Sequence, residues 1–280
     1  MINPDLIRDS KLKIVASKVL SGEPVDREDA LAMLSTMDIP GLGIIANHVR
    51  ESLNGNTTYY GVNININYTN ICELRCPLCA FSCDNGDPQA YLYSLDDIER
   101  IVRDADQEGI DEVHIVGGLH PDLKLDYFTG MLRRIKSVNP RLFIVAFTAV
   151  EYDYFAKVNG MSLRGIFQEL IDAGLGALPG GGAEIFAQAK RGVIAPKKIP
   201  ADRWLEVMET AHSMGLTTNA TMLYNHVESN EDIVDHINRI RELQSRTGGF
   251  KTFVPLQFHE ENTTVKTGRG ESSGFTDLRI

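Results

Sequence analysis

The chain has 280 residues, with 28 Lys and Arg against 38 Asp and Glu, which gives a formal net charge of -10. This acidic balance argues against nucleic acid as a partner, since nucleic-acid-binding proteins carry basic faces. No apolar run approaches the roughly 18 residues of a membrane span, and the first residues lack the apolar core of a signal peptide. Composition therefore predicts a cytoplasmic protein without a membrane segment.

The first sixty residues are predicted to be helical. Apolar residues recur at helical spacing within the first twenty positions. Asp26 is the expected cap of a second helix over residues 27–37, and the pattern over residues 40–53 indicates a third. This region holds no combination of side chains typical of catalysis, so residues 1–60 are interpreted as an N-terminal helical extension.

Strand and helix alternate from Gly61 onward. The predicted strands cover residues 62–68, 112–116, 142–147, 177–178, 217–224 and 253–258. Helices are predicted over residues 94–108, 126–138, 162–173, 202–214 and 232–245. This alternation indicates a parallel sheet with right-handed crossovers, which fits both a (β/α) barrel and an open, doubly wound sheet.

The positions of the unusual residues favour the barrel. Glycine-rich or polar clusters follow all six predicted strands, at residues 72–83, 117–121, 148–151, 180–184, 225–226 and 259–262. In a barrel, the carboxyl ends of the strands converge on one mouth, whereas in an open sheet they spread along an edge. The sequence therefore predicts an α/β fold with a TIM-type (β/α) barrel over residues 61–280.

All four cysteines of the chain lie in one short run, at Cys72, Cys76, Cys79 and Cys83. A cytosolic protein keeps its thiols reduced, which argues against disulfides. Structural zinc sites usually pair cysteines across a longer loop, and no such loop separates these four. The spacing favours an iron–sulfur cluster. Three ligands would leave one iron of a [4Fe–4S] cluster open to a small molecule, whereas four would restrict the protein to electron transfer.

The spacing Cys72-x3-Cys76-x2-Cys79 resembles the signature of the radical S-adenosylmethionine (SAM) superfamily. The resemblance implies that these three thiolates hold a [4Fe–4S] cluster whose open iron binds SAM, and that Cys83 is not a ligand. It also implies a reducing electron donor such as flavodoxin or ferredoxin. One departure is Leu78, because the residue before the third cysteine is often aromatic in the family.

Further segments resemble the menaquinone/F420 branch of that superfamily, and within it the aminofutalosine synthases. The resemblance implies that an adenosyl radical adds to 3-[(1-carboxyvinyl)oxy]benzoate, giving 6-amino-6-deoxyfutalosine with loss of the carboxylate, so that SAM is consumed. A sister enzyme, such as dehypoxanthine futalosine cyclase or an F420-precursor synthase, is one alternative. A four-cysteine electron-transfer or zinc protein is another. The segments that carry the resemblance are HIVGGLHPDL, AFTAVE, AGLGALPGGGAEIF, TTNATMLYNHVE and TGGFKTFVPLQFHEENT.

Candidate cofactor contacts follow the second and fourth strands. Gly117 and Gly118 permit close backbone approach, and the family resemblance implies that the methionyl amino group of SAM lies beside them, with a plain strand-to-loop turn as the alternative. Glu184, after three consecutive glycines, is a candidate for the ribose or an amine, with helix capping as its alternative. Arg191 is a candidate partner for a ligand carboxylate, with a surface role as its alternative.

Further candidate contacts follow the third strand or lie within the fifth, and each has more than one possible partner. Thr148 and Glu151 are predicted to hydrogen-bond cofactor or substrate. Asn219 is predicted to share the inner face of the barrel with Thr221, where bound ligand or a polar core layer would satisfy both.

Three histidines are candidates for substrate contact or proton transfer. They are His120, His226 and His259. Taken singly, each is more often a structural or exposed residue.

The predicted barrel has six strands, whereas a complete (β/α)8 barrel has eight. Residues 277–280 resemble the lead-in to a seventh strand of the family. We therefore expect a barrel truncated after its sixth strand, with its C-terminal part missing and with unpaired edges on the first and sixth strands.

Overall fold

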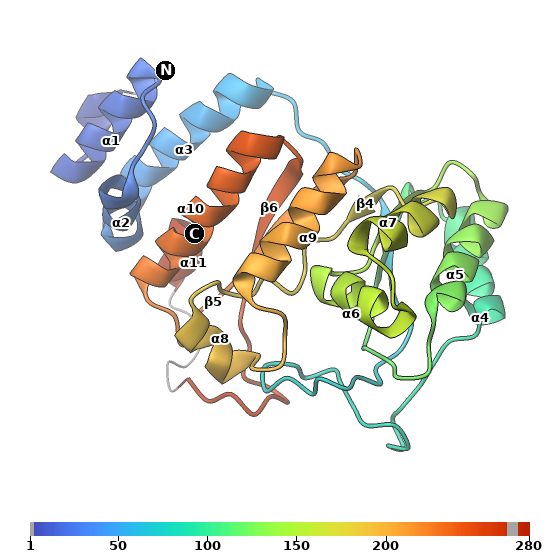
Figure 1. Ribbon diagram of the computed structural model, residues 1–280. Coiled ribbons are helices and arrows are strands. Elements are labelled where there is room, and N and C mark those ends of the chain that lie inside the picture. The colour runs from blue at the N-terminus through green and yellow to red at the C-terminus, as the bar shows by residue number, and fades with distance from the viewer. Residues whose placement is uncertain (1–2, 268–273) are drawn as a thin grey trace.

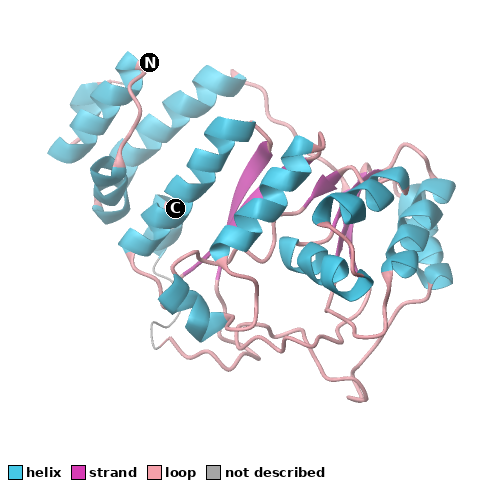
Figure 2. Cartoon of the chain, in the orientation of Figure 1, coloured by secondary structure: helices cyan, strands magenta, loops and turns pink. Residues whose placement is uncertain are grey.

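Six parallel strands form one sheet whose spatial order follows the sequence (Figures 1 and 2). A computed structural model describes residues 3–267 and 274–280. The sheet is a half-barrel that runs from β1 to β6, which confirms the predicted α/β architecture. The strands are β1 (Asn63–Asn67), β2 (Glu112–Val116), β3 (Phe143–Ala146), β4 (Ala177–Leu178), β5 (Thr217–Tyr224) and β6 (Phe250–Gln257).

One group of helices precedes the sheet in the chain, and a second group alternates with the strands and covers the outer face. The N-terminal elements are η1 (Pro4–Leu6), α1 (Ser10–Ser21), α2 (Arg27–Ser35) and α3 (Ile39–Asn54). The later helices are α4 (Leu95–Gln107), α5 (Leu125–Val138), α6 (Ala149–Asn159), α7 (Leu163–Asp172), α8 (Gln188–Ile194), α9 (Ala201–Ser213), α10 (Asn230–Thr247) and α11 (Gly274–Arg279). Among residues 3–267 and 274–280, no helix combines the length and the apolar character needed to cross a membrane.

Capping residues explain where several helices begin. Asp26 and Ser94 each accept a backbone N–H of the first turn, as predicted, and a carboxylate three residues later completes a capping box. Thr148 does the same for α6, a helix that the sequence did not predict. Because α6 is mostly buried, its apolar residues show no clear one-sided period.

Alternation along β1 decides which of its side chains face the concave side of the sheet, and the register with β2 sets their level. Ile64 and Ile66 of β1 pack into the main hydrophobic core, under the helices. Side chains alternate along a strand, so Asn67 points to the concave side. Asn67 pairs with Val116, which puts the ends of β1 and β2 at the same level.

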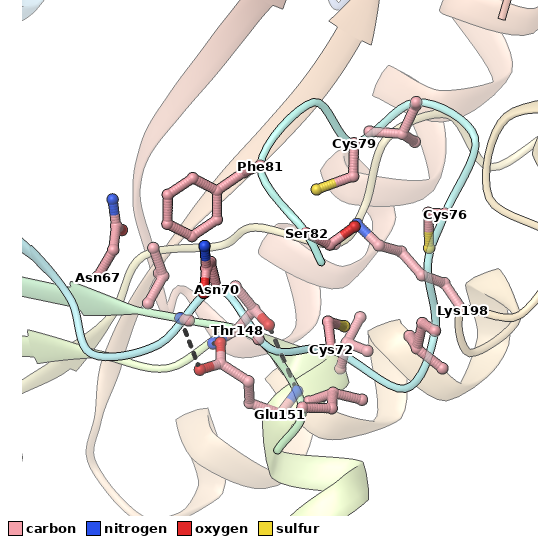
Figure 3. A pocket seen from close by; sticks show the side chains of 18 residues that line it. Asn67, Asn70, Cys72, Cys76, Cys79, Phe81, Ser82, Thr148, Glu151 and Lys198 are labelled. Carbon is pink, nitrogen blue, oxygen red and sulfur yellow. Dashed lines mark hydrogen bonds between the residues drawn. The ribbon is translucent and has the colours of Figure 1, made fainter. Parts of the chain in front are cut away.

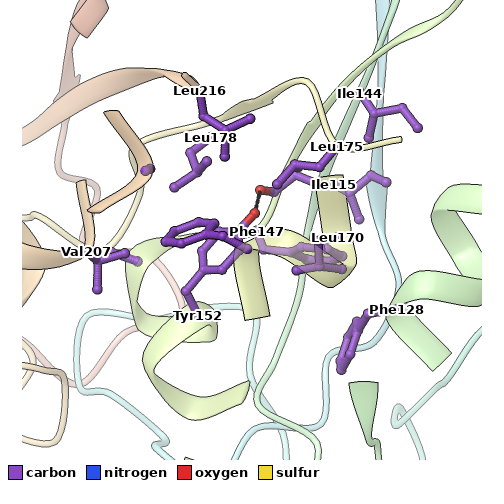
Figure 4. Packing of buried hydrophobic residues seen from close by; sticks show 14 of the residues in the cluster. Ile115, Phe128, Ile144, Phe147, Tyr152, Leu170, Leu175, Leu178, Val207 and Leu216 are labelled. Atoms are coloured by element: carbon purple, nitrogen blue, oxygen red, sulfur yellow. Dashed lines mark hydrogen bonds between the residues drawn. The ribbon is translucent and has the colours of Figure 1, made fainter. Parts of the chain in front are cut away.

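The main core lies between the sheet and the helices α4, α5, α6, α7, α9 and α10 (Figure 4). Aromatic rings dominate its centre: Phe128 and Phe155 lie 4.1 Å apart, and Phe147 contacts both at 5.3 Å. Tyr152 is fully buried there, and its hydroxyl donates to the carbonyl of Ala146 at 3.0 Å. This packing holds the carboxyl end of β3 against α6.

His236 of α10 is a fully buried, neutral histidine. Its ring stacks on Phe186 with centroids 4.0 Å apart. Nδ1 accepts the N–H of Phe186 at 3.2 Å and Nε2 donates to the carbonyl of Thr221 at 3.0 Å. Burial lowers the pKa of His236 to about 3.

We expect the free energy of unfolding to fall as the pH decreases from 6.5 towards 3, because the unfolded chain takes up a proton that folded His236 excludes. The contribution is at most about 1.4 kcal/mol per pH unit. Urea unfolding of the wild type and of His236→Gln at several pH values measures it, with exposed His259→Gln as control. The His236 variant should show a shallower pH dependence than the other two. Equal slopes in all three proteins would contradict the assignment.

Candidate functional site

A pocket of about 210 Å³ opens at the carboxyl ends of β1, β2 and β3 (Figure 3). It brings together seven of the predicted site residues, which come from the segments that follow these three strands. These are Cys72, Cys76, Cys79, Gly117, Gly118, Thr148 and Glu151. The convergence of the strand ends that favoured a barrel is therefore present in the structure.

Backbone hydrogen bonds close the cysteine loop. The N–H of Cys83 donates to the carbonyl of Asn70 at 2.9 Å, and the N–H of Cys72 donates to Cys83 at 3.2 Å. Cys83 is buried behind this short ladder and does not line the pocket. The structure therefore separates three thiols at the pocket from the fourth.

The three pocket thiols are of the ligand type that holds iron–sulfur clusters. Among the residues that the structure describes, no three His, Cys, Asp or Glu side chains are arranged to hold one metal ion. In a cubane cluster each thiolate binds a different iron. Burial raises the pKa of the Cys76 thiol, whereas Lys198 lowers it. Binding to iron favours the thiolate form that burial alone disfavours.

Gly117 and Gly118 have a steric reason to be glycine. A Cβ on Gly118 would lie 2.1 Å from the carbonyl oxygen of Ile71, and one on Gly117 would lie 2.6 Å from the ring of Tyr68. The N–H of Gly118 also donates to the carbonyl of Thr69 at 3.0 Å. The two glycines thus dock the start of the cysteine loop onto β2 and keep their backbone at the pocket surface.

Glu151 is a fully buried carboxyl group at the pocket wall. It accepts the N–H of Thr148 at 2.7 Å, the N–H of Gly117 at 3.2 Å and the hydroxyl of Tyr68 at 2.9 Å. Burial raises the pKa of Glu151 to about 7, although these three donors oppose the rise. The carboxyl therefore links β1, β2 and α6 directly beneath the pocket.

Lys198 is a site residue that the sequence analysis missed. It lines the pocket, and its Nζ lies 2.5 Å from Oε1 of Glu184. Burial lowers the pKa of Lys198, but Glu184 and Cys76 raise it to a net value above the ordinary one. The pKa of Glu184 is lowered despite its burial, because of Lys198. The pair is therefore ionised, and Glu184 faces Lys198 rather than lining the pocket itself.

Arg191 lies outside the pocket lining and is almost fully buried. Its guanidinium donates to the carbonyls of Gly182, Ala183, Ile185 and Ile199. Four of its five N–H groups are thus directed at the main chain around β4. These bonds tie together the two segments on either side of α8, of which one carries Glu184 and the other Lys198.

Asn219 and Thr221 do not line this pocket. Asn219 lines a separate cavity of about 350 Å³, together with His114 and Lys251. The hydroxyl of Thr221 donates to the carbonyl of Gly180 at 2.9 Å and is buried. Thr221 therefore belongs to a polar core layer, which was the alternative to ligand binding.

The three candidate histidines also lie outside the pocket lining. His120 is buried, and its Nδ1 accepts the N–H of Asp122 at 3.2 Å. His226 is buried, with Nε2 2.9 Å from the carbonyl oxygen of Leu223. His259 is exposed.

Comparison with known proteins finds one matching family and several similar enzymes. The model of the Radical SAM superfamily matches residues 66–240. Aminodeoxyfutalosine synthase of Thermus thermophilus is 40% identical over 276 residues, which are 98% of this chain and 74% of that protein. The Streptomyces coelicolor enzyme of the same name is 40% identical over 252 residues, which are 90% of this chain and 65% of that protein.

A relative of slightly lower identity carries the name of a different enzyme. The 5-amino-6-(D-ribitylamino)uracil–L-tyrosine 4-hydroxyphenyl transferase of Methanopyrus kandleri is 37% identical over 238 residues, which are 84% of this chain and 64% of that protein. This chain therefore spans between 64% and 74% of the length of these three curated relatives.

Solved structures show a similar fold. The crystal structure of methylornithine synthase (PylB) has a TM-score of 0.73 at 17% identity, covering 95% of this chain and 75% of that chain. The crystal structure of the [FeFe]-hydrogenase maturase HydG has a TM-score of 0.76 at 15% identity, and the match covers 99% of this chain and 64% of that chain.

Serine substitutions test the separation of the thiols. After anaerobic reconstitution, Cys72→Ser, Cys76→Ser and Cys79→Ser should each lose the cluster, because each removes the ligand of one iron. Cys83→Ser should keep it, because this thiol lies outside the pocket. Iron and sulfide content per chain and the visible absorbance measure the outcome. Loss of the cluster in a correctly folded Cys83→Ser protein would overturn the three-cysteine assignment.

Proposed function

The chain belongs to the radical SAM superfamily, and we propose that it catalyses the aminodeoxyfutalosine synthase reaction. The main support is the 40% identity to two enzymes of that name, over 98% and 90% of this chain. In the proposed reaction, the adenosyl group of SAM is joined to the enol-ether carbon of 3-[(1-carboxyvinyl)oxy]benzoate. The carboxylate is lost as carbon dioxide or bicarbonate, and 6-amino-6-deoxyfutalosine is formed.

The cofactors of this enzyme are a [4Fe–4S] cluster and SAM. When bound, the cluster supplies the electron that cleaves SAM to methionine and a 5′-deoxyadenosyl radical. Cys72, Cys76 and Cys79 are the residues that would hold it. Apolar side chains, among them Leu74 and Leu78, line the pocket around them and limit the access of water.

Lys198 is the proposed partner of the methionine carboxylate of SAM. It is the only Lys or Arg among the described residues that line the pocket. An ammonium group has three donors, and Glu184 takes one of them. The other donors remain for a ligand carboxylate, and the ion pair keeps the ammonium charged although it is largely buried.

The backbone of Gly117 and Gly118 and the side chains of Thr148 and Glu151 are proposed to contact the remainder of SAM. Glu151 fixes the N–H of Gly117 and of Thr148, so it sets the position of both loops. Glu184 is proposed to act through Lys198. The electron donor is proposed to be a small reducing protein such as flavodoxin or ferredoxin.

A sister reaction is the second candidate. Identity of 37% to the tyrosine 4-hydroxyphenyl transferase of the F420 branch favours it as the alternative. The two candidates differ in the fate of the adenosyl group. It stays in the product of the proposed reaction, whereas an enzyme that abstracts hydrogen releases free 5′-deoxyadenosine.

One anaerobic reaction analysed by mass spectrometry tests the proposed function. The mixture contains reconstituted protein, SAM, a strong reductant and the carboxyvinyl-oxybenzoate, and the Cys76→Ser protein is the control. We expect an adenosine-bearing adduct with the mass of aminodeoxyfutalosine, in the wild type only. Free 5′-deoxyadenosine with no adduct would instead support a sister enzyme.

Replacing Lys198 tests its assignment. Lys198→Met should raise the Kd of SAM about 10- to 100-fold, because a charge-assisted hydrogen bond contributes about 1.5–3 kcal/mol. This variant also leaves Glu184 buried without its cation, so the Lys198→Met/Glu184→Gln protein separates binding from folding. Equilibrium dialysis without reductant measures the Kd, with Lys198→Arg as the charge-preserving control. An unchanged Kd in the double variant would contradict the assignment.

A further inference from the structure

The pocket has two chemically different ends (Figure 3). Cys76, Cys79 and Lys198 lie on one side, and Lys198 supplies the positive charge there. Phe81 and Asn67 lie on the other side, near the carboxyl end of β1. The contacts proposed above for SAM involve neither Phe81 nor Asn67, so this second group needs its own explanation.

Phe81 presents an aromatic ring to the pocket. It lines the pocket and is 44% exposed, although it lies only two residues after a proposed cluster ligand. Its ring packs edge-on against Tyr91, with centroids 6.2 Å apart and planes at 79°. Tyr91 in turn contacts Tyr93 at 5.0 Å. The exposed ring is thus the end of a row of three aromatic side chains.

Hydrogen bonds hold this row in place. The hydroxyl of Tyr91 donates to the carbonyl of Asn67 at 3.0 Å, and its N–H donates to Oδ1 of Asn70 at 2.9 Å. The hydroxyl of Thr69 donates to the carbonyl of Tyr91 at 2.6 Å. Phe81 therefore packs on a fixed support, which lowers the entropic cost of binding a second ring there.

Asn67 supplies a polar group beside this ring. Its side chain lines the pocket and makes no hydrogen bond with any residue that the structure describes. Asn70, three residues later, uses both ends of its amide, on Tyr91 and on the carbonyl of Gln89. The hydroxyl of Ser82, which also lines the pocket, is likewise without a partner among the described residues. The amide of Asn67 thus faces the pocket beside an exposed ring.

From this arrangement we propose that the Phe81–Asn67 end of the pocket binds the aromatic carboxylate co-substrate, with its ring against Phe81 and its carboxylate on the amide of Asn67. This rests on the proposed function, in which SAM and the benzoate must lie next to each other. An exposed aromatic ring favours a second ring in edge-on or offset geometry. An amide N–H beside it donates to a carboxylate without adding charge.

Binding measurements without reductant test this assignment. The probe is 3-[(1-carboxyvinyl)oxy]benzoate, titrated into reconstituted protein saturated with SAM, and the Kd of SAM is measured separately. Phe81→Ala and Asn67→Ala should each raise the Kd of the benzoate about tenfold and leave the Kd of SAM within about twofold. Asn67→Asp should weaken the benzoate further, because two carboxylates then repel.

Two control proteins accompany these variants. Phe81→Tyr keeps the ring and should bind the benzoate like the wild type. Tyr60→Ala removes an aromatic ring that is 91% exposed but lies outside this pocket, and it should change neither Kd. Iron content confirms that each protein carries its cluster.

The outcomes separate this assignment from the proposed function. An unchanged benzoate Kd in both alanine variants overturns the assignment. A weaker Kd for SAM in Phe81→Ala also overturns it, because the ring would then hold the adenine. A wild type that binds the benzoate but forms no adduct contradicts the proposed reaction, while the comparison of variants still decides on Phe81 and Asn67. A wild type that does not bind the benzoate overturns both.

Discussion

The backbone contact between Gly118 and Ile71 is the constraint on which the site depends. The carbonyl oxygen of Ile71 lies where any side chain at position 118 would begin, at 2.1 Å from an ideal Cβ. Nearby, the N–H of Glu73 donates to the carbonyl of Leu119 at 3.1 Å. These contacts dock the cysteine loop on the end of β2. The thiols can face the glycine pair only because no Cβ separates the two loops.

The sequence was most informative where one local pattern decides the structure. β2 and β5 have the predicted bounds, and Ser94 and Asp26 cap the predicted helices, because alternation and capping are short-range signals. The three cysteines and two glycines were proposed from the family resemblance, and the structure brings them to one pocket. α6 was missed because a buried helix shows no polar face, and α8 is only seven residues long.

Charged residues were harder to assign, because burial and partners are not visible in a single sequence. Lys198 and Arg191 lie within one basic segment, yet they have different roles in the structure. Lys198 pairs with Glu184 at the pocket, whereas Arg191 is directed at four carbonyls. Their separation depends on how the chain turns after β4, where Glu184 adopts a positive φ of 50°. The glycines at residues 180–182 signal a turn there, but not the direction in which the chain leaves it.

The shortness of β4 has a consequence for how this protein responds to ligands. β4 has two residues and joins β1–β3 to β5 and β6. Gly117 and Gly118 belong to the first part, and Lys198 follows β4 on the side of the second. A molecule that contacts both connects the two parts of the sheet across its shortest strand. Such a molecule binds only when the sheet is intact at β4, so its binding raises the free energy of local opening there. Ligand occupancy and local opening at β4 are therefore thermodynamically linked.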